Sequence, residues 1–246
     1  MSDPTTDAAR ARRAELAANL VDVRTRIGAA ARAVGRDAAE ITLVAITKTW
    51  PASDVALLAG LGVTDVGENR DQEAGPKHEL GAGLALRWHF VGQLQRNKAR
   101  SVASYADVVQ SVDRLELVSA LDRGASGAGR TLDVLLQVDL DDRPAAATGA
   151  GVRGGAGPAE LAGLAEAVDR CAALRLAGVM AVAPLRTPAR PAFERLAALA
   201  GALRADHPGA TIISAGMSGD LEEAIAAGAT HARVGTAVLG GRPSLR

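Results

Sequence analysis

The chain has 246 residues, of which 48% are hydrophobic, and its formal net charge at pH 7 is zero. This length and apolar content suit one αβ barrel with a substantial core. The even charge balance and an aromatic content of 2% argue against nucleic acid as the main ligand. The sequence opens without an apolar signal segment, contains no run of 18 apolar residues and has a single cysteine. We therefore expect a soluble, cytoplasmic protein with no membrane partner and no internal disulfide.

The first predicted element is a long leading helix over residues 7–34, with Gly35 just beyond its end. Short apolar runs then alternate with helical patterns. The predicted strands cover residues 41–47, 63–67, 86–91, 106–112, 131–139, 174–182, 210–214 and 230–235. The predicted helices between them cover residues 53–60, 69–80, 93–103, 114–125, 158–173, 189–205 and 218–227.

Strands that alternate with helices pair in parallel. Eight such units after one leading helix predict a single α/β domain over residues 1–246, a (β/α)8 TIM barrel. A doubly wound open sheet is the alternative, but no G-x-G-x-x-G follows the first strand. Residues 141–158 are rich in Gly, Ala and Pro and are predicted to form a mobile loop, which either covers a ligand or is a plain insertion.

The first predicted strand ends in ITLVAITKTWP, where an apolar run leads into Lys48. Only three of the 28 basic residues are lysines. A lysine at the end of a core strand in such a chain indicates an amine that must lose its proton, which arginine cannot do. In barrels of this kind the active site lies at the carboxyl ends of the strands, and the first strand delivers Lys48 there.

Two further loops at this end predict a phosphate site. The seventh strand runs into SAGMSGDLEE, which indicates a glycine turn with Ser218 as the N-cap of the next helix. The eighth strand runs into RVGTAVLGG, where Gly235 and Thr236 bring backbone N–H groups to the same rim. Phosphate sites in this fold often use the loops after strands seven and eight, so together they favour phosphate binding over plain helix capping.

Arg233 lies inside the eighth predicted strand, where a buried arginine needs a partner. One interpretation is a salt bridge to a core carboxylate such as Asp65 or Glu68. The other is that its guanidinium donates to a ring nitrogen of a ligand. An amine, a phosphate site and a ring-facing arginine in one barrel mouth indicate pyridoxal 5′-phosphate (PLP), whose aldehyde condenses with an amine.

Seven segments carry a resemblance to a known family: AITKTWP, VGENRDQE, WHFVGQLQRNKAR, QSVDR, GVMAV, SAGMSGDLEEAIAAG and RVGTAVLGGR. From about residue 41 to residue 242 the chain resembles the YggS/PROSC family, the pyridoxal phosphate homeostasis proteins. The resemblance implies a barrel similar to the N-terminal domain of alanine racemase. It also implies a role in PLP homeostasis, with PLP held as a Schiff base on Lys48 and without robust catalytic activity.

The resemblance assigns roles to individual positions. It implies that Lys48 is the Schiff-base lysine, that Arg233 faces the pyridine nitrogen, and that two residues form the pocket wall and three bind phosphate. The wall residues are Asn69 and Met217, and the phosphate ligands are Ser218, Gly235 and Thr236. The chain departs from the family where Ala215 replaces a common methionine, and where QVDL replaces QVN at the fifth strand.

Two observations favour a cofactor carrier over an enzyme. Alanine racemase takes an acid–base tyrosine from a second domain, whereas this sequence stops at Arg246 and its one tyrosine, Tyr105, lies near the fourth predicted strand. An arginine at the ring nitrogen also favours the neutral ring, which is the weaker electron sink. The alternatives are a low-activity PLP-dependent racemase or lyase, and an aldolase-type enzyme that forms a Schiff base with a sugar phosphate.

The expected partners are PLP and PLP-requiring apo-enzymes, and the expected state is a monomer. Trp88 and His89 are interpreted as packing and wall residues. Gln93, Asn97 and Lys98 follow the third predicted strand, and their role stays open between ligand and partner. No set of histidines and cysteines has the spacing of a metal site.

Overall fold

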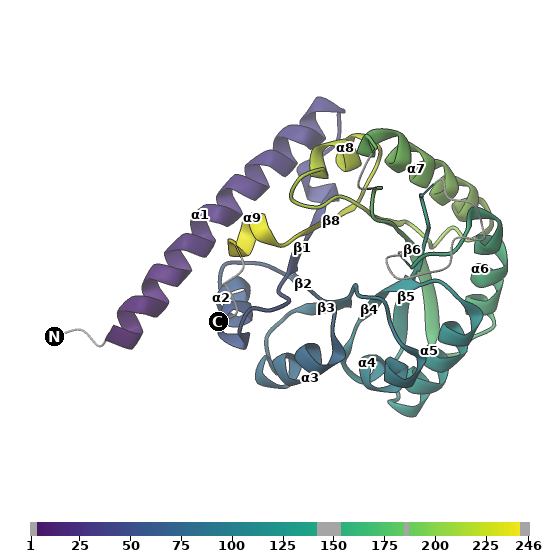
Figure 1. Cartoon of the computed structure of the whole chain (residues 1–246), viewed down its shortest axis with the longest axis horizontal. Helices are drawn as coiled ribbons and strands as arrows, with labels where there is room; N and C mark the ends of the chain where they lie inside the picture. Colours follow the sequence, from purple (N-terminus) through teal and green to yellow (C-terminus); the bar gives the residue numbers. More distant parts are fainter. Residues whose placement is uncertain (1–3, 142–153, 185–186, 242–246) are drawn as a thin grey trace.

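The structure is a computed structural model that describes residues 4–141, 154–184 and 187–241. Eight parallel strands close into a barrel in sequence order, with β1 beside β8, and helices surround the ring (Figure 1). The predicted (β/α)8 barrel is therefore confirmed, and each strand lies within two residues of its expected bounds. The strands are β1 (Thr42–Ile46), β2 (Asp65–Glu68), β3 (Arg87–Phe90), β4 (Val108–Val112), β5 (Leu132–Gln137), β6 (Leu174–Met180), β7 (Ile212–Ser214) and β8 (His231–Val234).

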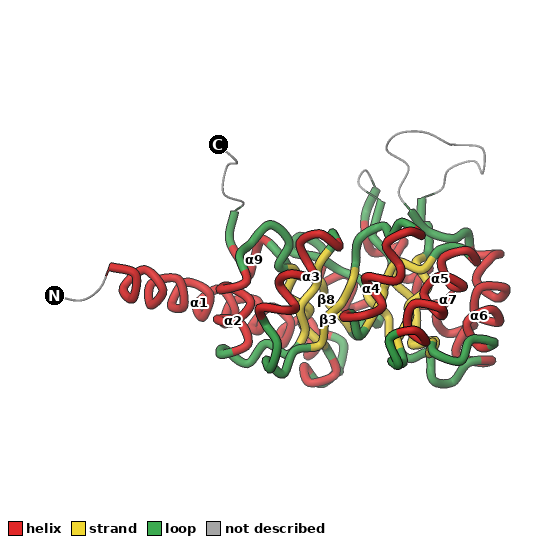
Figure 2. The backbone as a smooth tube through the Cα atoms, turned by 90° about the horizontal axis from the view of Figure 1, so that it is seen from below, coloured by secondary structure: helices red, strands yellow, loops and turns green. Residues whose placement is uncertain are grey.

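The helices follow the predicted alternation and are seen from the side in Figure 2. Short 3-10 turns, which the sequence patterns did not separate, precede α4 and α6. Among the described residues, no helix is both long enough and apolar enough to cross a lipid bilayer. The helices are α1 (Pro4–Ala33), α2 (Ala52–Ala59), α3 (Asp71–Leu80), α4 (Ala99–Tyr105), α5 (Leu115–Gly127), α6 (Leu161–Asp169), α7 (Ala189–Asp206), α8 (Leu221–Ala226) and α9 (Thr236–Leu239), and the 3-10 turns are η1 (Ala38–Glu40), η2 (Arg96–Lys98) and η3 (Pro158–Glu160).

The last part of the chain differs from the sequence predictions in the start of α8 and in the presence of α9. The helix predicted over 218–227 begins only at Leu221, and its N-cap is Asp220, so the prediction of Ser218 as N-cap is wrong. The reason is a turn before the helix, in which the Asp220 carboxylate accepts the Met217 N–H at 2.6 Å. Helix α9 was not predicted, because four residues are too few to show a period. The mobile loop predicted over 141–158 lies mostly outside the described residues, which omit 142–153.

The leading helix α1 lies along one side of the barrel, and its first turns extend beyond it (Figure 1). Its buried face carries Leu16, Leu20, Val23 and Ile27, which pack with apolar residues of β1, β8 and α9. This is the apolar stripe expected of a helix that covers a barrel. Burial of these four side chains therefore holds α1 next to the strands that begin and end the ring.

The barrel interior holds polar as well as apolar side chains. Val108 and Gln110 lie two residues apart on β4, on the same face of the strand. Gln110 is bonded to Ser214 on β7, which is not a neighbour of β4 in the ring, so this face points into the barrel. The opposite face, with Val109, packs in the layer between strands and helices. The interior thus provides a route for hydrogen bonds between distant strands.

Candidate functional site

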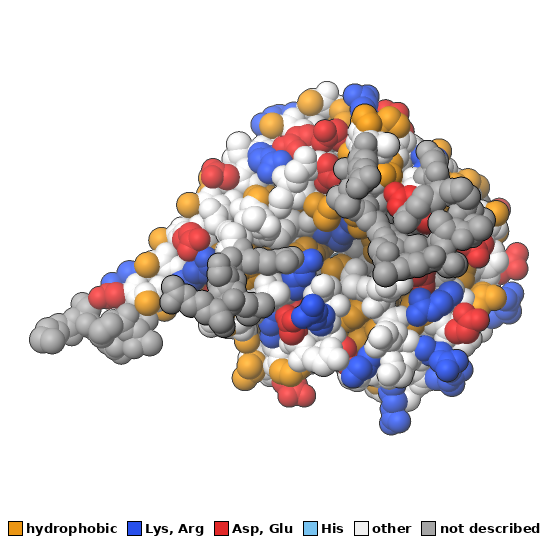
Figure 3. All heavy atoms as spheres, viewed as in Figure 1, with side chains coloured by type: hydrophobic (Ala, Val, Ile, Leu, Met, Phe, Trp, Pro, Cys, Tyr) orange, Lys and Arg blue, Asp and Glu red, His pale blue; other side chains and the backbone are white. Residues whose placement is uncertain are grey.

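One cavity of about 380 Å³ lies at the carboxyl ends of the strands. Figures 1 and 3 view the barrel from this end, and Figure 3 shows a hollow bordered by basic and apolar side chains. All seven residues that the sequence predicts to bind a cofactor line it: Lys48, Asn69, Met217, Ser218, Arg233, Gly235 and Thr236. The rest of the lining is Ile46, Val91, Gly92, Met180, Val182 and Gly219. The fold brings these residues together, and their role in binding stays a prediction.

Lys48 reaches the cavity from a turn that follows β1. The Trp50 N–H donates to the Thr47 carbonyl at 3.1 Å and closes the turn over residues 47–50. Thr49 has φ of 70°, the one positive φ outside glycine among the described residues. Lys48 itself is half-buried. The amine therefore stands on a tight turn at the rim and not on the strand.

A buried lysine from α3 supports this turn, and the sequence analysis did not single it out. Lys77, 8% exposed, donates through Nζ to the Thr47 carbonyl at 2.9 Å and to Glu68 Oε1 at 2.7 Å. The Thr47 hydroxyl donates to the same Glu68 oxygen at 2.7 Å. Burial raises the pKa of Glu68, while the bonds from Lys77 and Thr47 act in the opposite direction. The rarity of lysine in this chain was the signal that could have pointed to Lys77.

Arg233 faces the cavity from β8 and is 5% exposed. Its Nη1 donates to the Ser214 carbonyl and to the Ser214 hydroxyl, and its Nη2 donates to the Ala181 carbonyl, each at 2.8 Å. Burial lowers the pKa of Arg233 to about 10, so the guanidinium stays charged at neutral pH. Three of its five N–H donors are used by these bonds, which leaves donors for a ligand in the cavity.

The interpretation of Arg233 as a salt-bridge partner of Asp65 or Glu68 is wrong. Within the described residues Arg233 forms no ion pair, since Asp65 is bonded to His89 and Glu68 to Lys77. Carbonyl oxygens at the ends of β6 and β7 satisfy its charge instead. A buried cation needs hydrogen-bond acceptors, and these need not be carboxylates.

A chain of hydrogen bonds runs from Arg233 across the barrel interior. The Ser214 hydroxyl donates to Gln110 Oε1 at 2.7 Å, and Gln110 Nε2 donates to His89 Nδ1 at 2.8 Å. His89 Nε2 then lies 2.8 Å from Asp65 Oδ1. Because Nδ1 accepts, the neutral imidazole carries its proton on Nε2 and donates to Asp65. We call the five connected residues the interior chain: Arg233, Ser214, Gln110, His89 and Asp65.

The interior chain changes the interpretation of His89. Its ring is 1% exposed and belongs to the barrel interior, and the cavity lining does not include it. Burial lowers the pKa of His89, so the neutral ring is favoured. Burial would raise the pKa of Asp65, but the bonds from His89 and Thr64 outweigh it and the pKa lies below its ordinary value. Trp88, in contrast, packs in the outer core as expected.

The two predicted phosphate loops meet at one side of the cavity. The Ser218 hydroxyl accepts the Ala237 N–H of α9 at 3.3 Å and so joins the loop after β7 to the loop after β8. In the part of the chain that the structure describes, the backbone N–H groups of Ser218, Gly219 and Thr236 have no acceptor. A Cβ placed on Gly235 would come no closer than 3.5 Å to other atoms, so protein packing alone does not require glycine there. N–H groups without acceptors beside open space suit an anion.

The leading helix supports these loops from outside. Arg26 of α1 donates through Nη2 to the Ser218 carbonyl at 3.0 Å and pairs with Glu222 of α8 at 2.7 Å. Asn19 donates to the Val238 carbonyl at 2.9 Å. These bonds fasten carbonyls in the loop after β7 and in α9, so α1 stabilises the two segments that carry the unbonded N–H groups.

Asn69 stands at the border between the cavity and a second one. A Cβ on Gly92 would lie 2.2 Å from the Asn69 carbonyl oxygen, so only glycine lets the end of β3 approach Asn69 this closely. The neighbouring cavity, of about 450 Å³, is lined by Asn69 together with Gln93 and Lys98. Two of the residues whose role the sequence left open thus lie beside the predicted site.

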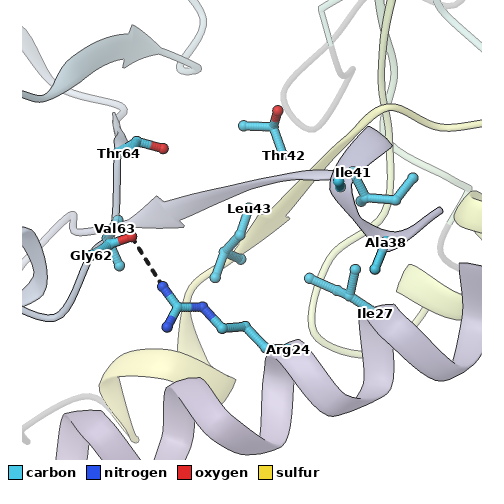
Figure 4. Close-up of a pocket in the computed structure, with 10 residues that line it drawn as sticks. Arg24, Ile27, Ala38, Ile41, Thr42, Leu43, Gly62, Val63 and Thr64 are labelled. Atoms are coloured by element: carbon cyan, nitrogen blue, oxygen red, sulfur yellow. Dashed lines mark hydrogen bonds between the residues drawn. The ribbon is translucent and has the colours of Figure 1, made fainter.

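A cavity at the amino ends of the strands offers a contrast. It has a volume of about 480 Å³ and lies between α1 and the starts of β1 and β2 (Figure 4). Among its described lining residues the one ionisable side chain is Arg24, which points to the Gly62 carbonyl and donates to it at 3.1 Å. This larger space brings no amine or reactive group together, so size alone does not locate the functional site.

Comparison with known proteins gives consistent matches. The family described as alanine racemase, N-terminal domain, matches residues 13–243. A protein of Mycobacterium bovis named pyridoxal phosphate homeostasis protein is 42% identical over 250 residues, which cover 94% of each chain. Among solved structures, an unknown protein from Bifidobacterium adolescentis has a TM-score of 0.84 at 29% identity and 97% coverage of each chain. PipY of Synechococcus elongatus PCC7942, solved with PLP bound, has a TM-score of 0.76 at 31% identity, over 92% of this chain and 100% of its own.

Proposed function

We propose a function from the premise that this chain belongs to the family of pyridoxal phosphate homeostasis proteins. The proposed function is to bind PLP in the cavity at the carboxyl ends of the strands and to hold it covalently on Lys48 for cofactor homeostasis. The relative PipY, solved with PLP bound, supports this proposal. We further propose that the whole chain is one domain that acts as a monomer in the cytoplasm.

The residues present fit PLP. When bound, PLP supplies an aldehyde that condenses with an amine, and it carries an anionic phosphate. Lys48 provides the amine. The unbonded N–H groups of Ser218, Gly219 and Thr236 provide donors for the phosphate, and Arg233 provides a charged donor for the ring nitrogen. Apolar side chains such as Ile46, Val91 and Val182 provide walls for a flat ring.

One observation carries the proposal. The cavity gathers an amine from the end of β1, a buried guanidinium from β8 and a set of unbonded backbone N–H groups from the ends of β7 and β8. These groups match three chemically distinct parts of one small molecule. A plain structural role for each residue would not require all three sets to open into the same space.

The site favours a carrier without robust catalysis. A guanidinium that keeps its proton cannot accept one from a pyridine nitrogen, so Arg233 favours the neutral ring and a weak electron sink. Tyr105 is not part of the cavity lining; its hydroxyl lies 3.4 Å from Asp71, and burial raises its pKa. The curated relatives are named as homeostasis proteins. We propose that PLP-requiring apo-enzymes receive the cofactor from this protein.

The test starts from purified protein incubated with PLP and reduced with borohydride. The wild-type chain should show an absorbance band near the violet edge and a PLP adduct on Lys48 by mass spectrometry. Lys48→Ala should abolish the reducible adduct, because only an amine forms it. Lys98→Ala, which changes a lysine outside the cavity lining, should keep it. An adduct that persists in Lys48→Ala would contradict the assignment of Lys48.

The enzyme alternatives are separated by two measurements. In deuterated solvent, the PLP-loaded protein should exchange the α-proton of amino acids no faster than free PLP does. Fast exchange that depends on Lys48 would favour a racemase or lyase. A colourless protein that instead forms a reducible adduct with a sugar phosphate would favour the aldolase alternative.

A further inference from the structure

We propose that residues 47–50, which we call the Lys48 turn, are a strained support for the amine, and that Glu73 and Lys77 are positioning residues that keep it closed. The functional part of this inference rests on the proposed binding of PLP. The structural part concerns only the chain's own contacts and can be tested without PLP.

The strain is visible in the backbone. The Lys48 turn is closed by a bond from its fourth residue to its first, and its third residue, Thr49, has φ of 70°. A turn of this geometry places glycine at the third position, because side chains clash there. For a β-branched residue such a φ is a genuine outlier. The Thr49 side chain is exposed, so no burial of its methyl group compensates the conformation.

Contacts from outside the turn hold the strained form. Glu73 Oε2 accepts the Thr49 N–H at 2.9 Å, directly at the strained residue. Lys77 Nζ donates to the Thr47 carbonyl, which also closes the turn. The Thr47 hydroxyl is fixed by Glu68 on β2. Side chains of α3 and β2 thus satisfy polar groups on both sides of Lys48.

The consequence is that the turn depends on its surroundings. Strained backbone persists only where neighbouring structure determines it, and it concentrates at functional sites. Without the contacts from α3, Thr49 would relax toward negative φ and the Lys48 backbone would rotate away from its present direction. A glycine at position 49 removes this dependence, because glycine adopts positive φ without a clash. The two changes should therefore compensate each other.

The experiment compares four proteins: wild type, Glu73→Ala, Thr49→Gly and the double variant. We expect Glu73→Ala to speed PLP release about tenfold, the scale of one lost hydrogen bond to a charged group. Thr49→Gly should release PLP at the wild-type rate and should not lower the melting temperature. The double variant should release PLP close to the wild-type rate, because the relaxed turn no longer needs Glu73. Glu79→Ala, on the exposed face of α3, is the matched control and should change nothing.

Lys77→Met tests the second contact. It leaves Glu68 buried without its cation, so a lower melting temperature is expected on its own. The informative quantity is the rate of PLP release at a temperature where both proteins are folded. We expect release to be faster in Lys77→Met and to recover when Thr49→Gly is added, although the melting temperature stays low. Rescue of release without rescue of stability is an effect that a merely structural role would not give.

Hydrogen exchange of the apo-protein separates failure of the turn from failure of the proposed function. The Thr49 and Trp50 amides should be protected in wild type, and the Thr49 amide should lose protection in Glu73→Ala. Unprotected amides in wild type, or equal PLP release in all four proteins, would overturn the positioning role. Protected amides in a wild-type protein that forms no PLP adduct would instead refute the proposed function.

Discussion

The two charged side chains that face the cavity are held in opposite ways. Lys48 lies on a turn beyond its strand, is half-buried, and depends on side chains of a neighbouring helix. Arg233 lies within its strand, is 5% exposed, and is held by carbonyl oxygens and by the interior chain. The difference teaches that the fold itself fixes the arginine, whereas the turn that carries the amine is held in place by side chains of α3 and β2. Such an arrangement suits a carrier, which must release what it holds.

Removal of the Arg233 guanidinium should lower the stability of the protein more than any other change predicted here. Arg233→Met removes three buried hydrogen bonds, two to Ser214 and one to the Ala181 carbonyl. A buried acceptor left without its donor costs about 1–3 kcal/mol. We expect the free energy of unfolding to fall by about 3 kcal/mol, measured by urea unfolding. Lys48→Met should lower it by less than about 1 kcal/mol. Equal losses in the two variants would contradict the difference between the two sides.

A surface arginine provides the control for this pair. Arg190 is exposed and pairs with Glu194 one helical turn away. Exposed pairs of this kind contribute about 0.3–0.5 kcal/mol, so Arg190→Met should unfold almost as wild type. A large effect of Arg190→Met would show that loss of any arginine destabilises this chain.

Acidification should destabilise the fold through two buried histidines near Arg233, His89 of the interior chain and His231 of β8. Burial lowers the pKa of His231 to about 4 and also lowers that of His89, whereas an unfolded histidine titrates near 6.5. Between about pH 6.5 and 4 the unfolded chain therefore binds more protons than the folded one, and stability falls as pH falls. Each histidine contributes at most about 1.4 kcal/mol per pH unit. Urea unfolding from pH 7.5 to 4.5 measures the slope, and His231→Asn should reduce it.

Near Lys48, the pH dependence of stability that is linked to Glu68 has the opposite sign. Burial raises the pKa of Glu68, so the folded protein binds that proton more readily than the unfolded chain. The stability linked to Glu68 is thus present at low pH and is lost as pH rises through the folded pKa. Glu68→Gln should therefore steepen the loss of stability on acidification. If neither His231→Asn nor Glu68→Gln changed the slope of unfolding free energy against pH, the roles given to His231 and Glu68 would be contradicted.

The two predicted phosphate loops allow a prediction of binding strength. Ser218→Ala should weaken PLP retention by about 1–2 kcal/mol, the scale of a hydrogen bond to a charged group. The Ser218 hydroxyl also accepts the Ala237 N–H, so the melting temperature of the apo-protein is measured alongside. Unchanged retention with a lower melting temperature would mean that Ser218 only joins the two loops.

Two buried serines give the smallest and most closely matched test. Ser214 takes part in the interior chain, while the Ser111 hydroxyl is buried without a partner among the described residues. Ser214→Ala should cost about 1 kcal/mol of unfolding free energy, since it removes two hydrogen bonds. Ser111→Ala should be neutral or stabilising, because it removes a buried hydroxyl that forms no hydrogen bond among the described residues. Equal effects would show that the interior chain adds no stability through Ser214.

The barrel could be predicted from the sequence because its elements are local. Alternating apolar runs and helical periods indicated all eight strands, within two residues of their observed bounds. The rule that sites lie at the carboxyl ends of barrel strands then placed Lys48 and Arg233 in one mouth, where the structure has them. The start of α8 could not be predicted as well. The Ser218 hydroxyl is taken up by the Ala237 N–H of α9, and Asp220 closes the turn before α8 and becomes its N-cap.

What the sequence by itself determined is the order of strands and helices and the set of residues at their ends, since these follow from periodicity and from short motifs. Only the tertiary structure decided what holds those residues. Gln110 and Ser214 lie 104 positions apart and meet only because the ring closes. Lys77 reaches the Thr47 carbonyl only because α3 packs beside the Lys48 turn. Buried polar groups must find partners wherever folding places them, and those partners come from distant segments that no local pattern encodes.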